Sequence, residues 1–279
     1  MAWIRVDDNF YGNVWLYNVD TKQKAGIERP MTSETSLSFH PDGKHLYFAS
    51  ENWYNPVISA LDQTYIYDKT TKIYVVVLAK DGENPFAPKL VKAYEEEEKE
   101  EGDEDKEESK EKEEEGEKPI VIDLEGIAQR VYPVPIDAAN SFGLIATEGT
   151  LYFASRENPG MMPDGDTPKG FQLNAFDIEE KETKVVSTSV RGYDASPDRK
   201  KLLIRTRESS FVVMDAGGTE IPKEKGHIDL SDWSFEIEPP LEWRQILRNI
   251  WRWERDFFYD PNMHGVDWKG VWKQYSSLL

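Results

Sequence analysis

Histidine is the side chain best suited to acid–base or metal chemistry near neutral pH, and this sequence contains four. His40 and His45 flank a turn at Asp42, and we interpret both as exposed residues of a β-hairpin. His227 follows a Lys-Gly turn, and His264 lies in a predicted loop between two helices. None of these positions stands out as a catalytic base.

Short motifs that support other chemistry are missing from the sequence. There is no G-x-S-x-G elbow, which counts against an α/β-hydrolase, and no H-E-x-x-H or other compact spacing that suggests zinc. No glycine-rich loop suggests a nucleotide, and the lack of cysteine excludes disulfides and thiolate chemistry. We therefore expect no catalytic residue, no cofactor and no metal ion in this chain.

The last stretch, residues 239–279, predicts two helices joined by a short turn. Asp260-Pro261 predicts the end of the first helix, Gly265 allows a tight turn, and Asp267 is a suitable N-cap for the second helix. Both apolar faces are too bulky to cover only each other, so the stretch is interpreted as the start of a longer domain. The apolar stripe of the first helix contains Trp243, Ile246, Leu247, Ile250, Trp251, Trp253, Phe257 and Phe258.

The same stretch carries a specific resemblance. The run EWRQI, followed by W-R-x-x-RDFFYDPNMHGVDW, closely resembles the opening of the helical domain in tricorn-type serine peptidases, which have relatives among the C-terminal-processing peptidases. The alternative is a pair of core helices with no catalytic connection. We expect structural roles, in packing or in ion pairs, for Trp243, Trp251, Arg255, Asp256, Phe257, Phe258, Tyr259, Asp260 and Trp268.

Upstream of residue 239 the chain predicts short β-strands. Turn sequences lie at Pro41-Asp42-Gly43, Glu148-Gly149 and Ser196-Pro197-Asp198, and the segment LYFAS occurs at both 46–50 and 151–155. A further hairpin is expected over 65–78, with its turn at Asp68-Lys69-Thr70, and a closing outer strand over 228–237. A four-stranded unit, made of one hairpin and two further strands, therefore occurs about three times.

This repeat has roughly the 40-residue period of a propeller blade. We predict a mainly β chain: a partial β-propeller of about three to four blades over residues 1–238, followed by an α-helical hairpin over 239–279. The alternative is an ordinary antiparallel sandwich. The resemblance agrees with the first interpretation, because a propeller precedes the helical domain in tricorn-type peptidases.

Charge is concentrated in residues 95–118, which contain 16 acidic residues and 5 lysines within a chain of net charge −19. This composition predicts a solvated, disordered insertion, with calcium buffering or a basic partner as the alternative. The acidity argues against nucleic acid as a partner. The sequence shows no signal peptide and no membrane span, which leaves a cytoplasmic or a bacterial periplasmic location open for the parent protein.

The resemblance implies a function as well as a fold. In tricorn-type peptidases the propeller is thought to guide peptides toward a separate catalytic core, and the catalytic histidine and serine lie downstream of the helix that ends here at Leu279. We therefore expect a non-catalytic part of a peptide-trimming serine peptidase, inactive alone. The parent would act on peptides or unfolded proteins, as a homo-oligomer in the full-length protein. The alternative is a stand-alone propeller module that binds proteins or peptides.

Overall fold

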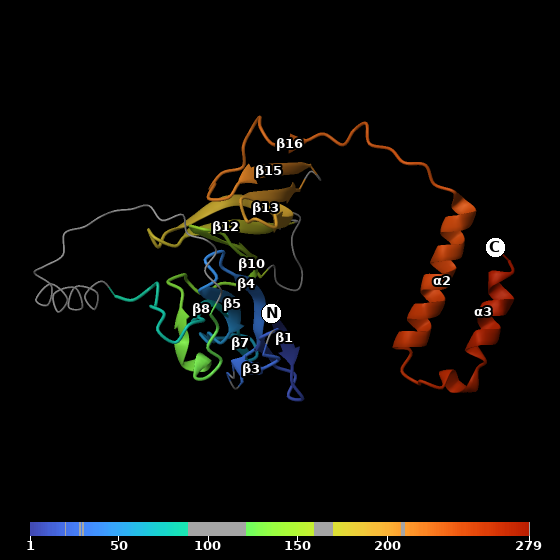
Figure 1. Ribbon diagram of the computed structural model, residues 1–279, viewed down its shortest axis with the longest axis horizontal. Helices are drawn as coiled ribbons and strands as arrows, with labels where there is room; N and C mark the ends of the chain where they lie inside the picture. The colour runs from blue at the N-terminus through green and yellow to red at the C-terminus, as the bar shows by residue number, and fades with distance from the viewer. Residues whose placement is uncertain are drawn as a thin grey trace, which may run out of the picture. The chain divides into compact units, whose positions relative to one another are not determined.

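The computed structural model describes the chain apart from residues 20, 28, 30, 89–120, 159–169, 208–209 and 279. The predicted acidic insertion at 95–118 thus lies outside the described residues. The chain divides into two compact units, Met1–Ile228 and Asp229–Leu279. The first unit contains the β-sheets and the second contains two α-helices (Figure 1).

The strands of the first unit form antiparallel sheets, in which most neighbours are consecutive along the chain. The first sheet contains β1 (Ala2–Val6), β2 (Gly12–Tyr17) and β3 (Lys24–Ile27). The second contains, in spatial order, β4 (Glu34–Phe39), β5 (His45–Glu51), β8 (Thr71–Val77) and β9 (Val131–Pro133). A separate hairpin contains β6 (Val57–Ile58) and β7 (Tyr65–Ile66). The largest sheet contains β10 (Ser141–Ala146), β11 (Thr150–Ser155), β12 (Phe171–Asp177), β13 (Thr183–Ala195), β14 (Lys201–Thr206), β15 (Phe211–Asp215) and β16 (His227–Ile228).

Strand β13 is shared between two groups of strands within the largest sheet. Its first part pairs with β12, and its second part, from Val190 to Ala195, pairs with β14. The register of both pairings shifts near Val190, so the ladder is irregular where β13 changes its partner. The sheet therefore consists of two four-stranded groups, β10 to β13 and β13 to β16.

The alternation of side chains along β5 explains how the sheets stack. Leu46 and Phe48 point into a core shared with the first sheet, whereas Tyr47 and Ala49 point into a core shared with β10 and β11. A third core lies between the two strand groups that meet at β13. Because both faces of β5 are covered, its four central residues, Leu46 to Ala49, are all apolar and buried. The sheets are layered one against the next (Figure 1).

The first strands of neighbouring sheets are joined by side-chain hydrogen bonds. Ser36 and Ser38 of β4 accept hydrogen bonds from the backbone N–H groups of Gly143 and Ala146 of β10, both at 2.8 Å. The hydroxyl of Tyr193 in β13 donates to the carbonyl of Gly143. These contacts bring β4, β10 and the second part of β13 together. The arrangement is propeller-like, so the predicted mainly β fold with a partial propeller is confirmed.

Two strand predictions were wrong. The hairpin expected over 65–78 does not form, because β8 is buried between β5 and β9 while β7 pairs with β6 instead. Of the outer strand expected over 228–237, only its first residue lies in a strand, the short β16. The turns at Pro41-Asp42-Gly43 and Glu148-Gly149 connect paired strands as predicted, and Gly43 has the positive φ that such a turn requires.

The second unit contains α2 (Pro239–Phe257), a short 3-10 turn (Met263–Gly265) and α3 (Trp268–Ser276). The described part of the first unit includes a 3-10 turn at Ile127–Arg130. As predicted, the Asp267 side chain caps α3 by accepting a hydrogen bond from Gly270 N–H, and Gly265 has a positive φ. The first helix ends at Phe257, three residues earlier than Asp260. Neither helix has the length and apolar character needed to cross a bilayer, judged over the described residues.

Candidate functional site

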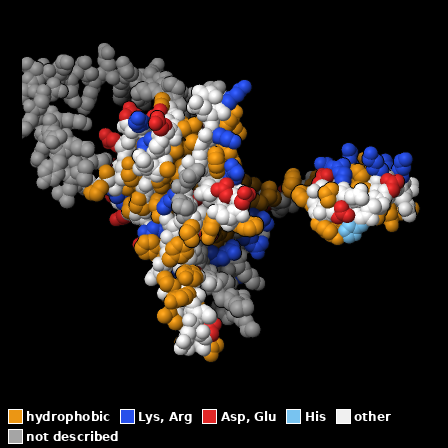
Figure 2. Space-filling view, turned by 90° about the horizontal axis from the view of Figure 1, so that it is seen from below, with side chains coloured by type: hydrophobic (Ala, Val, Ile, Leu, Met, Phe, Trp, Pro, Cys, Tyr) orange, Lys and Arg blue, Asp and Glu red, His pale blue; other side chains and the backbone are white. Residues whose placement is uncertain are grey.

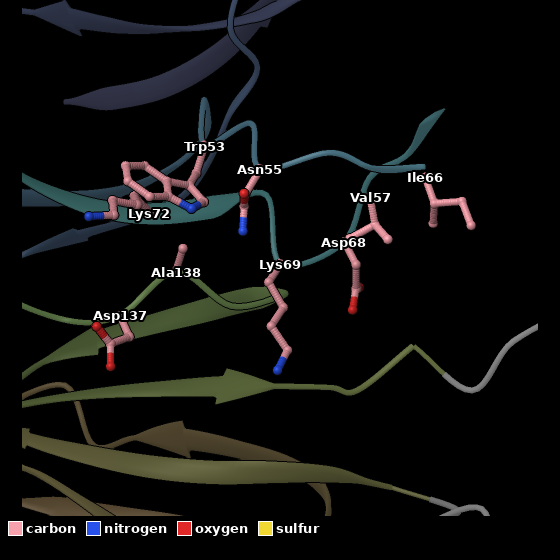
Figure 3. Close-up of a pocket in the computed structure, with 9 residues that line it drawn as sticks. All are labelled: Trp53, Asn55, Val57, Ile66, Asp68, Lys69, Lys72, Asp137 and Ala138. Carbon is pink, nitrogen blue, oxygen red and sulfur yellow. The ribbon is translucent and has the colours of Figure 1, made fainter. Parts of the chain in front are cut away.

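An open depression of about 410 Å³ lies on the first unit, Met1–Ile228, beside the β6–β7 hairpin (Figure 3). We call this unit the propeller unit. Its walls come from three parts of the chain: the segment from β5 to β7, the turn that leads into β8, and the loop after β9. It is lined by Trp53, Asn55, Val57, Ile66, Asp68, Lys69, Lys72, Asp137 and Ala138.

Asn140 holds two walls of this depression together. Its side-chain oxygen accepts a hydrogen bond from Lys69 N–H at 2.9 Å, and its amide group donates to Asp68 at 2.8 Å. Next to it, the backbones of Thr71 and Ala139 exchange two hydrogen bonds of 3.1 Å. The turn at residues 68–70 is therefore attached to the loop after β9 even though the two are about 70 residues apart in sequence.

The lining combines an aromatic ring with charges of both signs. The Lys72 ammonium lies 4.3 Å from the ring centre of Trp53, and the backbone N–H of Trp53 donates to Thr70. Figure 3 shows the Lys69 side chain extending from its turn, with the carboxylates of Asp68 and Asp137 in the same depression. These lining residues include no serine, cysteine or histidine, so their chemistry suits the binding of a ligand with apolar and charged groups rather than nucleophilic catalysis.

A second group of side chains lies in the β4–β5 turn, where the sequence HPDGKH brings His40, Asp42 and His45 together. The Nδ1 atom of His40 is 3.0 Å from Asp42 Oδ1, and the Nδ1 atom of His45 is 2.7 Å from Asp42 Oδ2. The side chains of His40 and His45 are only 10% and 16% exposed, so the interpretation of both as exposed hairpin residues was wrong. His40 is covered because its ring packs near Tyr47 and its Nε2 atom contacts the carbonyl of Glu148 at 3.0 Å.

The electrostatics of Asp42 follow from these contacts. Burial alone would raise the pKa of Asp42, but the neighbouring His40 and His45 rings and a hydrogen bond from Lys44 N–H stabilise the carboxylate. Their combined effect holds the pKa of Asp42 well below its usual range. Asp42 is thus a carboxylate with both oxygens engaged.

The other two histidines do not join such a group in the described part of the chain. The Nε2 atom of His227 lies 2.9 Å from the carbonyl of Pro222. His264 contacts the hydroxyl of Tyr259, and its ring packs against Phe258. Asp260 accepts hydrogen bonds from the backbone N–H groups of Asn262 and His264, which shapes the turn between the helices.

The residues of the predicted helical motif fall into two sets. Trp251 and Trp268 stack on each other between α2 and α3, and Arg255 pairs with its neighbour Asp256 at 2.7 Å. Trp243 and Phe257 are 54% and 82% exposed, so within this unit they do not contribute to the predicted packing. Figure 2 shows basic side chains gathered along one edge of this unit, where Arg244, Arg248 and Arg252 line a shallow groove.

Sequence reasoning missed both the depression and the histidine group. The signal for the second was present in the spacing H-x-D-x-x-H at residues 40–45, which is compact enough for one turn. The depression had no comparable signal, because Trp53, Lys69 and Asp137 are far apart along the chain. Only strand pairing brings them together.

Comparison with known proteins agrees with the fold. Residues 1–216 match the family described as the Tricorn protease second beta propeller domain, and residues 239–279 match the Tricorn protease C1 domain. In the crystal structure of the tricorn protease, a region that covers 99% of this chain has the same fold, with a TM-score of 0.75 at 14% sequence identity. That region is 25% of the solved chain.

Two full-length relatives show how much of such a protein is present. Tricorn protease homolog 1 of Streptomyces coelicolor is 31% identical over 258 residues, which are 88% of this chain and 23% of the relative. The Tricorn protease homolog of Saccharolobus solfataricus is 25% identical over 271 residues, or 96% of this chain and 23% of the relative. The chain spans about a quarter of the length of these relatives. It belongs to the tricorn protease family, with sequence that matches that family's second β-propeller and C1 domains.

Proposed function

We propose that this chain is the non-catalytic propeller and C1 part of a tricorn-like serine peptidase, and that its propeller binds peptides on their way to a catalytic core. The observation that carries this proposal is the order of the two family matches, with the second propeller directly followed by the C1 domain. The parent enzyme would trim peptides by hydrolysis.

The depression beside β6 and β7 supports a role in peptide binding. A peptide in extended conformation offers apolar side chains, carbonyl oxygens and charged termini. Trp53 supplies an apolar ring surface, Lys69 and Lys72 supply cations, and Asp68 and Asp137 supply carboxylates. The depression is open to solvent and largely preformed, since Asn140 attaches its walls to each other, so we expect weak, rapidly reversible binding of many sequences.

Fluorescence anisotropy with short labelled peptides tests this proposal. Three peptides, acidic, basic and neutral, are titrated with the whole chain and with the variants Trp53→Ala and Lys69→Ala. We expect measurable binding of at least one peptide, and a several-fold loss of affinity in Trp53→Ala because the aromatic surface of the depression is gone. Lys69→Ala is expected to weaken the acidic peptide most.

Matched variants control for general effects of the substitutions. Trp233 is also exposed but belongs to the other unit, and Lys184 is an exposed lysine on β13 away from the depression. Trp233→Ala and Lys184→Ala should bind like the unmodified chain. If all four variants bind the peptides as tightly as the unmodified chain does, the peptide-binding role is overturned. Peptide cleavage that a serine-directed inhibitor blocks would overturn the non-catalytic assignment.

A further inference from the structure

We propose that His40, Asp42 and His45 form a site for a divalent transition-metal ion, with Zn²⁺ as the ion that fits best. The three residues offer one donor atom each, and these donors all lie within 4.8 Å of one another. All three come from a single turn of six residues, so they are close together whenever the β4–β5 hairpin is formed.

The hydrogen bonds of His40 indicate which of its ring nitrogens carries the lone pair that could bind a cation. The backbone N–H of Asp42 donates to His40 Nδ1 at 3.2 Å, which requires a lone pair on Nδ1. The remaining ring nitrogen, Nε2, then carries the proton and donates to the carbonyl of Glu148 at 3.0 Å. Metal-ligating histidines usually donate their second nitrogen to a carbonyl or carboxylate in this way.

The Asp42 carboxylate lies between the two imidazole rings. His40 Nδ1 lies 3.0 Å from Asp42 Oδ1. On the other side of the carboxylate, His45 Nδ1 lies 2.7 Å from Oδ2. A cation bound to His40 Nδ1, Asp42 and His45 would replace the hydrogen bond from Asp42 N–H to His40 Nδ1 and use the charge of the carboxylate.

The donor set selects the type of ion. Two imidazole nitrogens and one carboxylate oxygen suit Zn²⁺ and other late first-row metals, whereas Ca²⁺ and Mg²⁺ prefer oxygen ligands alone. Zn²⁺ binds such donors at about 2.0–2.2 Å, which holds them about 3.3–3.6 Å apart in a tetrahedron. The donors, which lie within 4.8 Å of one another, would move closer together to reach that geometry, and water would take the fourth position.

The position of the site indicates a structural role. Glu148 lies in the β10–β11 turn, so the contact from His40 Nε2 to its carbonyl joins the β4–β5 turn to the equivalent turn of the next group of strands. A metal ion that orients His40 would strengthen this contact between neighbouring blades. Metal binding should therefore stabilise the propeller unit against heat.

Titration of the whole chain with Zn²⁺, after treatment with a chelator, tests the site. Isothermal calorimetry should show one tight equivalent in the unmodified chain, and its affinity should fall more than about 10-fold in both His45→Ala and Asp42→Asn. The acidic residues at 95–118 also offer carboxylates, but both variants retain them, so the difference between the isotherms reports on the site alone. His227→Ala is the matched control and should bind like the unmodified chain.

Visible absorption with Co²⁺ in place of Zn²⁺ gives a readout that needs no variant. Binding to two imidazoles and a carboxylate in a four-coordinate site should produce intense d–d bands, while carboxylate-only binding gives weak six-coordinate bands. If His45→Ala does not fold, as judged by circular dichroism, His45→Gln and the Co²⁺ spectrum of the unmodified chain take its place. Identical isotherms for the unmodified chain and its variants, or only six-coordinate Co²⁺ bands, would overturn the proposal.

Discussion

Trp251 of α2 and Trp268 of α3 exchange hydrogen bonds: the indole N–H of each donates to the backbone carbonyl of the other, at 2.8 and 3.0 Å. Their rings are nearly parallel, with an interplanar angle of 8°. The Arg255 guanidinium lies over the Trp251 ring, and the Trp272 ring packs against Trp251 at a tilt. This reciprocal pair joins the two helices of the C1 segment.

The reciprocal pair predicts that Trp268→Phe loosens the helical hairpin. The phenyl ring keeps most of the stacking surface, but the carbonyl of Trp251 loses its donor. The free energy of unfolding of the hairpin should fall by about 1 kcal/mol, as measured by urea denaturation followed at the helical circular dichroism band. Trp243→Phe, at an exposed position of α2, should change it by less than about 0.5 kcal/mol. Equal effects of the two substitutions would contradict the role of the pair.

Asp267 is predicted to determine where α3 begins. Its side chain accepts a hydrogen bond from Gly270 N–H at 3.0 Å, which satisfies one of the free donors of the first turn. Asp267→Ala should destabilise the hairpin by about 0.5–2 kcal/mol, whereas Asp267→Asn keeps an oxygen acceptor and should lose much less. Helical circular dichroism during thermal unfolding distinguishes these variants, and a full loss in Asp267→Asn would show that charge rather than capping matters.

Tyr152 joins β11 to the turn after β15. Its buried hydroxyl donates to the carbonyl of Gly218 at 2.8 Å and accepts from Gly217 N–H at 2.9 Å. Tyr152→Phe leaves both backbone groups without this partner, so the propeller unit should lose about 1–3 kcal/mol of stability.

The repeated segment LYFAS supplies the control for Tyr152. Tyr47 occupies the same place in the first copy and is equally buried, but among the described residues the structure records no hydrogen bond from its hydroxyl. Tyr47→Phe should therefore cost less than Tyr152→Phe in thermal unfolding followed at the β-sheet band. The opposite order would contradict the assigned contacts of Tyr152.

Glu34 should make the stability of the propeller unit depend on pH. Its side chain is buried, and this burial raises the pKa of the carboxyl above its ordinary value despite a hydrogen bond of 2.7 Å from Thr32. The folded state then binds the proton more tightly than the unfolded state, so this group favours folding below its unfolded pKa and loses that contribution as pH rises through the folded pKa.

Glu34→Gln removes this titration. The stability of Glu34→Gln relative to the unmodified chain should rise with pH between the ordinary pKa of glutamate and the raised folded value, and should stay constant above it. Urea denaturation of both proteins at several pH values from 4 upward measures this difference. Because all other titrating groups are common to the two proteins, a difference that does not change with pH would contradict the raised pKa.

Local sequence patterns predicted a good part of the fold. The turns at Pro41-Asp42-Gly43 and Glu148-Gly149, the cap at Asp267 and the two amphipathic helices depend on residues within a few positions of each other. The run at residues 242–268 was specific enough to indicate the family, and that resemblance is confirmed by the matches to the second propeller and C1 domains.

The pairing of β7 shows that a local sequence pattern does not predict which strands become neighbours. The sequence over 65–78 has the alternation and turn residues of a hairpin, but β8 takes β5 and β9 as its neighbours, and β7 pairs with β6. Which strands pair depends on the apolar surface that each pairing buries, and this surface comes from residues distant in sequence.

The sequence by itself determined the turns, the helix cap, the blade-like repeat and the family, because each rests on short-range backbone preferences or on a contiguous run of residues. Only the tertiary structure decided that Asn140 attaches the Lys69 turn to the loop after β9, and that Glu148 orients the ring of His40. The physical reason is that contacts of this kind form between segments about 70 to 110 residues apart. Packing of whole sheets brings these segments together, and no local sequence pattern predicts that they lie close to each other in space.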